Sequence, residues 1–216
     1  MGGLLRYERS LAEFVDRHRG MMLLLGALFV IGVVFGALAV SGVNPGDKAE
    51  LVAWLKPAVQ AMTAPDAGAG TLLLKQAVLR KLFFLALLWG LGISLLGAPG
   101  VMLFMLWRGF VTGFTVGFIV AEMGVGGLGV AVAGHLPQTL LEVPALLLAG
   151  TASAAFSLQV IRSWLERRKL NHFYPALARF TATLGATAAV LLVAGLVESY
   201  LSPVFIRFAA SLLHIV

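Results

Sequence analysis

The chain contains no cysteine, and only 12% of its 216 residues are charged. Without cysteine it cannot form a disulfide, a zinc–thiolate site or a dithiol redox couple. So little charge excludes an ordinary water-soluble domain, in which about 25% of residues are charged. Hydrophobic residues instead make up 60% of the chain, and its mean hydropathy is +0.95. This composition predicts an all-α, polytopic transmembrane helical bundle of the bacterial inner-membrane type.

The net charge is positive, at +6, with an isoelectric point near 10.2. In a soluble protein such a balance would suggest nucleic-acid binding. Here the basic residues lie in short clusters beside apolar segments, as the positive-inside rule describes. The clusters lack the aromatic interleaving and the fold signatures of nucleic-acid-binding domains. We therefore expect membrane lipids, and no nucleic acid, around a single membrane domain over residues 1–216.

Long apolar runs predict about five membrane-spanning helices. At roughly 20 apolar residues per crossing, they leave no stretch for a water-soluble domain. The first run also resembles a secretory signal, because Ala37-Leu38-Ala39 looks like a cleavage site. Signal cores are only about 7 to 15 residues long, which favours a retained span. The predicted spans cover residues 20–42, 82–97, 101–121, 138–161 and 180–201.

Two further segments are predicted to reach the membrane without crossing it. Residues 124–134 are small and apolar but too few to cross, which predicts a re-entrant or short half-helix before the fourth span. Residues 204–216, after Pro203, predict an amphipathic interfacial helix rather than a sixth crossing.

Residues 44–81 predict an extracytoplasmic connection that carries another amphipathic helix. Leu51, Trp54 and Leu55 recur there at helical spacing. This helix either lies among the lipid headgroups or offers a docking surface to a partner outside the cell.

The placement of Lys and Arg predicts the orientation. Residues 1–19 form a basic N-terminus and residues 162–179 a basic loop, both cytoplasmic under the positive-inside rule. Lys75, Arg80 and Lys81 would then lie on the outer side, against that rule.

Ionisable residues inside a bilayer are costly and therefore indicate function. Arg108, Glu122, His135 and Glu142 are the four candidates. Arg108 is expected about 10 Å from the inner end of its span and Glu142 about 28 Å from the same side, so we do not expect them to pair within one subunit. Arg108 either extends to the inner headgroups or contacts another helix.

The other three candidates, Glu122, His135 and Glu142, are predicted near the outer ends of spans three and four. A proton relay or a cation site there is an alternative to ordinary capping and headgroup contact. Their spacing matches no metal motif, and no nucleophile motif is present. We therefore predict no catalytic residue, no metal and no cofactor.

Glycines are spaced for close helix packing in two spans. Gly109, Gly113 and Gly117 repeat every four residues in the third span, and Gly32 and Gly36 share a face of the first. Such a face needs a tight neighbour, which is either another span or a second copy of the chain in a homodimer.

The most distinctive segment runs from Leu136 to Ala145 and opens the fourth span. It contains Pro137, Gln138, Glu142 and Pro144. Prolines there distort the first helical turns and free carbonyl groups for neighbouring helices.

Together with Arg108-Gly109, the small residues of the first span and the length, this segment resembles the stage II sporulation protein M family over essentially the whole chain. Relatives often read Pro-His-Gly with a downstream Glu before Pro-Ala, whereas Gln138 and Thr139 fill the His and Gly places here. In this respect the chain resembles the sporulation branch of the family. Any role that the histidine has in relatives has no matching residue here.

The resemblance implies a non-enzymatic membrane scaffold of the engulfment machinery. Such proteins hold the peptidoglycan hydrolases called stage II sporulation proteins D and P at the septal membrane of sporulating cells. The main alternative is a transporter or permease subunit, which the re-entrant segment and the proline-broken fourth span favour. Against it, we find no inverted repeat and expect no polar residue near the midplane of spans one, two or five.

Overall fold

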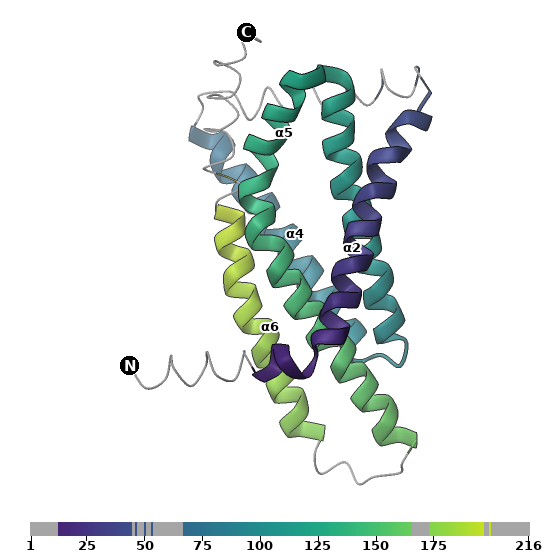
Figure 1. The fold of residues 1–216 in the computed structure, drawn as a ribbon. Coiled ribbons are helices and arrows are strands. Elements are labelled where there is room, and N and C mark those ends of the chain that lie inside the picture. The colour runs from purple at the N-terminus through teal and green to yellow at the C-terminus, as the bar shows by residue number, and fades with distance from the viewer. Residues whose placement is uncertain are drawn as a thin grey trace.

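A computed structural model describes residues 13–44, 67–165 and 173–196, together with positions 46, 50, 53 and 199. The described part of the chain is almost entirely helical and has no strand, which confirms the all-α prediction. Its elements are the helices α2 (Arg19–Ala39), α4 (Ala67–Ile93), α5 (Gly97–Leu165) and α6 (Phe173–Leu196), with a short 3₁₀ turn η1 (Val40–Gly42) after α2 (Figure 1).

Helix α5 consists of two helices that fold back on each other at Gly124. This glycine has φ 61° and ψ −143°, a backbone conformation that residues with a Cβ rarely adopt. We call residues 97–123 the first arm of α5 and residues 125–165 the second arm. Figure 1 shows the two arms running antiparallel, with the fold-back at the end of the bundle opposite the start of α2.

Five helical segments are long and apolar enough to cross a membrane, which confirms the predicted number. The largest differences are in where the second and the fifth spans begin. The second span begins well before residue 82, because residues 82–97 are too few for a crossing of about 20 residues. The fifth begins before residue 180. The spans are Arg19–Gly42, Leu74–Ile93, Gly97–Glu122, Gln138–Leu165 and Tyr174–Leu196.

The prediction of a separate re-entrant or short half-helix at residues 124–134 is wrong. Apart from Gly124, the backbone is helical throughout α5, so residues 125–134 form the first turns of the second arm. Pro137 and Pro144 do not break this arm, because helices in membranes tolerate proline where neighbouring groups satisfy the freed carbonyls. The arm is about 60 Å long, roughly twice the hydrocarbon thickness.

The second arm of α5 is the centre of the bundle. In its most apolar window 56% of residues are buried, against 22–33% in the other spans. Small buried side chains such as Ala149, Ser153 and Ala154 let the neighbouring helices approach it. Large apolar side chains of the outer helices, such as Phe35 and Leu103, are instead exposed, as expected of a lipid-facing surface.

The glycine faces of the first and third spans pack against each other within one chain. A Cβ on Gly32 or Gly36 would lie less than 3.0 Å from backbone atoms of the first arm of α5. A Cβ on Gly109 or Gly113 would lie equally close to the backbone of α2. Of the two neighbours that the sequence left open, another span is therefore the one present, and these faces are not free for a second copy.

This glycine seam generates a stability prediction. We expect Gly36→Ala to lower the free energy of unfolding in detergent by about 1–3 kcal/mol, because its methyl group would collide with Phe110. The matched control is Gly26→Ala on the same helix, where a Cβ meets nothing within 4 Å. Thermal unfolding of both variants measures the difference, and equal melting temperatures would contradict the seam.

Candidate functional site

Three charged side chains meet in the interior of the bundle. Lys81 of α4 donates through Nζ to Glu142 Oε2 at 2.8 Å, and Arg108 of the first arm of α5 donates through Nη2 to Glu142 Oε1. Side-chain exposure is 1% for Lys81, 5% for Glu142 and 12% for Arg108. We call these three residues the ion triad. Each oxygen of the Glu142 carboxylate accepts a hydrogen bond from a different cation.

The ion triad lies about halfway across the membrane. Lys81 is about 18 Å along α4 from its end at Ile93, and Arg108 is about 16 Å along α5 from its start at Gly97. The hydrocarbon core is roughly 30 Å thick, so both cations are near its centre. At this depth the charges of the triad are stabilised mainly by one another rather than by water.

The pairing of Arg108 with Glu142 contradicts the sequence prediction that these residues lie at different depths. That prediction measured both from a common inner membrane surface. In the structure the second arm extends beyond the start of the first: Ser157 Oγ donates to Ser94 O at 2.9 Å, so Ser157 is level with the turn before Gly97. Glu142 consequently sits at mid-depth rather than near the outer end.

The structure also decides between the two roles left open for Arg108. Its guanidinium contacts another helix and does not extend to the headgroups. Its Cζ atom lies 5.2 Å from the ring centroid of Phe84, a cation–π contact. Phe84 in turn packs edge-on against Phe104 and Trp107, so an aromatic cluster covers the arginine on the α4 side.

Sequence reasoning missed Lys81. The sequence analysis places it on the outer side and expects no polar residue near the midplane of the second span. The signal was present, because a run that starts at Leu82 is too short to cross and must be extended through Lys81. A Cβ on Gly195 would be 3.5 Å from Lys81 Cε, so α6 also packs beside this side chain.

Other predicted site residues surround the triad or lie elsewhere. Gln138 is buried one turn before Glu142 on the second arm, and Gly109 and Gly113 belong to the seam with α2. Glu122 is exposed near the end of the first arm, about 21 Å along that arm from Arg108, the residue that pairs with Glu142. Gly117 lies further along the seam, where a Cβ would be 3.0 Å from Ala37 Cα, and Pro144 is exposed. The other predicted residues lie outside the described residues or have undescribed side chains; they are Leu51, Trp54, Leu55, His135 and Pro137.

The chemistry available to the triad is electrostatic. Within the described ranges, no group of His, Asp and Glu side chains is arranged to hold a metal ion. An isolated ion in the bilayer costs several kcal/mol, and a carboxylate shared by two cations offsets that cost only while all three helices stay in place. The triad therefore ties α4 to both arms of α5.

This arrangement predicts the effect of neutralising the carboxylate. We expect Glu142→Gln to lower the free energy of unfolding by about 3–5 kcal/mol, because Lys81 and Arg108 would stay buried without their anion. Unfolding of the detergent-solubilised chain by sodium dodecyl sulfate measures it. The control is Glu122→Gln, which changes an exposed carboxylate on the first arm of α5 and should unfold like the wild type. Equal stability of the two variants would show that the triad does not hold the helices.

Comparison with known proteins places this bundle in a family. Neither a curated protein nor a solved structure matches the chain. The family model described as stage II sporulation protein M matches residues 25–203, which include all five spans in part or whole and every member of the ion triad. The chain, a multi-pass helical membrane protein, therefore belongs to the stage II sporulation protein M family.

Proposed function

We propose that the protein is a non-enzymatic membrane scaffold that anchors peptidoglycan hydrolases, the stage II sporulation proteins D and P, at the septal membrane during engulfment. The family match over residues 25–203 is the observation that carries this proposal. A scaffold needs a firm seat in the membrane and a surface for its partners, and no reactive centre.

The packing of the bundle supports a firm seat. The ion triad ties α4 to both arms of α5, and the glycine seam fixes α2 against the first arm. Both contacts are intolerant of sliding, because a shift of one helix would bury an unpaired ion or force backbone atoms together. Such a bundle suits an anchor that holds its partners at a constant position.

The orientation belongs to the proposal, with the N-terminus and the loop of residues 162–179 in the cytoplasm. The chain offers a direct test, because it has no cysteine and each introduced thiol is therefore unique. We expect the exposed Ser41→Cys, after α2, to react with a membrane-impermeant maleimide in intact cells. The exposed Ser163→Cys, near the end of α5, should react only after the cells are opened. The reverse pattern would invert the orientation.

The docking surface is proposed to lie in the extracytoplasmic connection, where the sequence predicts the amphipathic helix with Leu51, Trp54 and Leu55. In nanodiscs, the full chain should capture the purified hydrolase ectodomains. Replacing residues 49–62 by a Gly/Ser linker of equal length should abolish capture. The same replacement of residues 166–172, on the opposite side, should leave it unchanged. The proposal would be contradicted if the full chain captured no hydrolase, or if the variant with residues 49–62 replaced captured it as well as the full chain does.

A transporter subunit remains the second candidate function, because the ion triad itself favours it. Paired ions at mid-membrane depth are a feature of proton and ion pathways. A transporter would show solute or proton flux in proteoliposomes that Glu142→Gln abolishes, whereas the scaffold proposal expects no flux from either protein. Hydrolase capture and flux thus separate the two candidates.

A further inference from the structure

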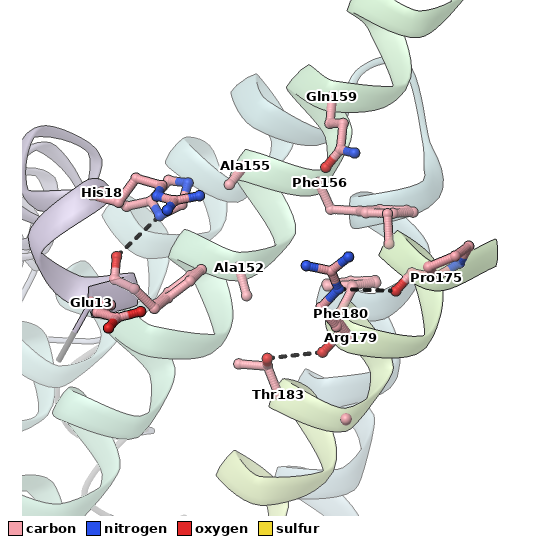
Figure 2. Close-up of a pocket in the computed structure, with 14 residues that line it drawn as sticks. Glu13, His18, Ala152, Ala155, Phe156, Gln159, Pro175, Arg179, Phe180 and Thr183 are labelled. Atoms are coloured by element: carbon pink, nitrogen blue, oxygen red, sulfur yellow. Dashed lines mark hydrogen bonds between the residues drawn. The ribbon is translucent and has the colours of Figure 1, made fainter. Parts of the chain in front are cut away.

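The bundle has a cavity at the end where α2 and α6 begin and α5 finishes. Its volume is about 740 Å³, and it lies between the residues before α2, the second arm of α5 and the first turns of α6. In Figure 2, Glu13 and His18 lie on one side, Ala152 and Ala155 lie between, and Arg179 and Phe180 lie on the other. The ion triad is elsewhere, so this cavity is unrelated to the site described above.

The cavity is polar at its rim and apolar at its floor. Glu13, Arg17 and Arg179 line it with exposed side chains, and His18 is half-buried. The floor consists of buried side chains from two helices: Ala152, Phe156 and Phe180. The rings of Phe156 and Phe180 stack with their centroids 4.7 Å apart, so α5 and α6 form the floor together.

The rim carries more positive than negative charge. Arg17 and Arg179 face one carboxylate, Glu13, and among the described residues neither arginine forms an ion pair. The nearby Asp16 pairs with Arg19 at 2.5 Å instead. Arg179 Nε donates to Pro175 O at 3.4 Å, which holds its guanidinium beside the first turn of α6. The rim is therefore suited to an anion.

The depth of the cavity matches the boundary between headgroups and hydrocarbon. Trp164 and Tyr174 are highly exposed aromatic residues at the same end of the bundle, and such side chains mark the membrane interface. From Gln159 at the rim to Ala152 at the floor, the second arm descends about 10 Å towards the membrane centre. A phosphate at the rim would thus be followed by an acyl chain along the floor.

We propose that this cavity is a binding site for an acidic phospholipid, with its phosphate held by Arg17 and Arg179 and an acyl chain lying on Ala152, Ala155 and Phe156. The combination of a basic rim, an apolar floor and interfacial depth fits one molecule that has both an anionic headgroup and a hydrocarbon chain. A soluble phosphate would use only the rim.

The test uses the delipidated full chain in detergent and native mass spectrometry with added phosphatidylglycerol or phosphatidylcholine. We expect the wild type to retain phosphatidylglycerol in preference to phosphatidylcholine. Arg17→Gln and Arg179→Gln should each weaken that binding about fivefold, as expected for one arginine near an anionic lipid surface. Ala155→Leu, which fills the floor, should also weaken it.

The matched control is Arg162→Gln, which removes an exposed arginine from the last turn of α5 without touching the cavity. Its lipid binding should equal that of the wild type, and glycerol phosphate should not displace the bound lipid. If Arg162→Gln lost as much lipid binding as the cavity variants, the effect would come from general surface charge, and the proposed site would be wrong. Displacement by glycerol phosphate, or no preference between the two lipids, would overturn it as well. If Arg179→Gln fails to fold, as judged by its melting temperature, Arg17→Gln and Ala155→Leu decide the outcome.

Discussion

One carboxylate held between two cations in the middle of the membrane is the constraint on which the arrangement of the central helices depends. Glu142 has to meet Lys81 and Arg108 at a single depth, because any of the three would be a costly isolated ion if its helix moved away. That requirement fixes the level of α4 relative to both arms of α5. The C-terminal end of the second arm extends past the start of the first arm, with Ser157 bonded to Ser94, and this offset places Glu142 at the depth of Arg108.

The other helices join this centre by contacts that do not involve charge. Lipid is as apolar as a leucine side chain, so helices in a membrane associate through close packing and polar contacts. Helix α2 uses close backbone approach at Gly32 and Gly36, and α6 uses ring packing, in which Phe180 stacks on Phe156 and leaves no room for a Cβ on Gly92. The bundle thus combines three modes of association: ion pairing between α4 and α5, close backbone approach between α2 and α5, and ring packing of α6 against α5 and α4.

The sequence was sufficient to predict the features that depend on local spacing. The number of spans follows from the lengths of apolar runs, and the need of Gly109 and Gly113 for a tight neighbour follows from their repeat of four. The ion triad could not be predicted in the same way, because the relative depth of Arg108 and Glu142 depends on where two separate helices begin. A related reason applies to Lys81, because an apolar run that begins at Leu82 leaves the charge of Lys81 outside the membrane.

The placement of charge distinguishes the interior of the bundle from its ends. The charges of the ion triad are paired with one another inside the bundle. The exposed faces of the spans carry apolar side chains such as Phe35 and Leu103, which are suited to contact with lipid. Side chains that can recognise a polar ligand are therefore concentrated towards the ends of the described helices, as Arg17 and Arg179 are at the cavity rim. The described bundle thus combines a centre held together by ion pairing with charged side chains at its ends, an arrangement that is compatible with the proposed scaffold.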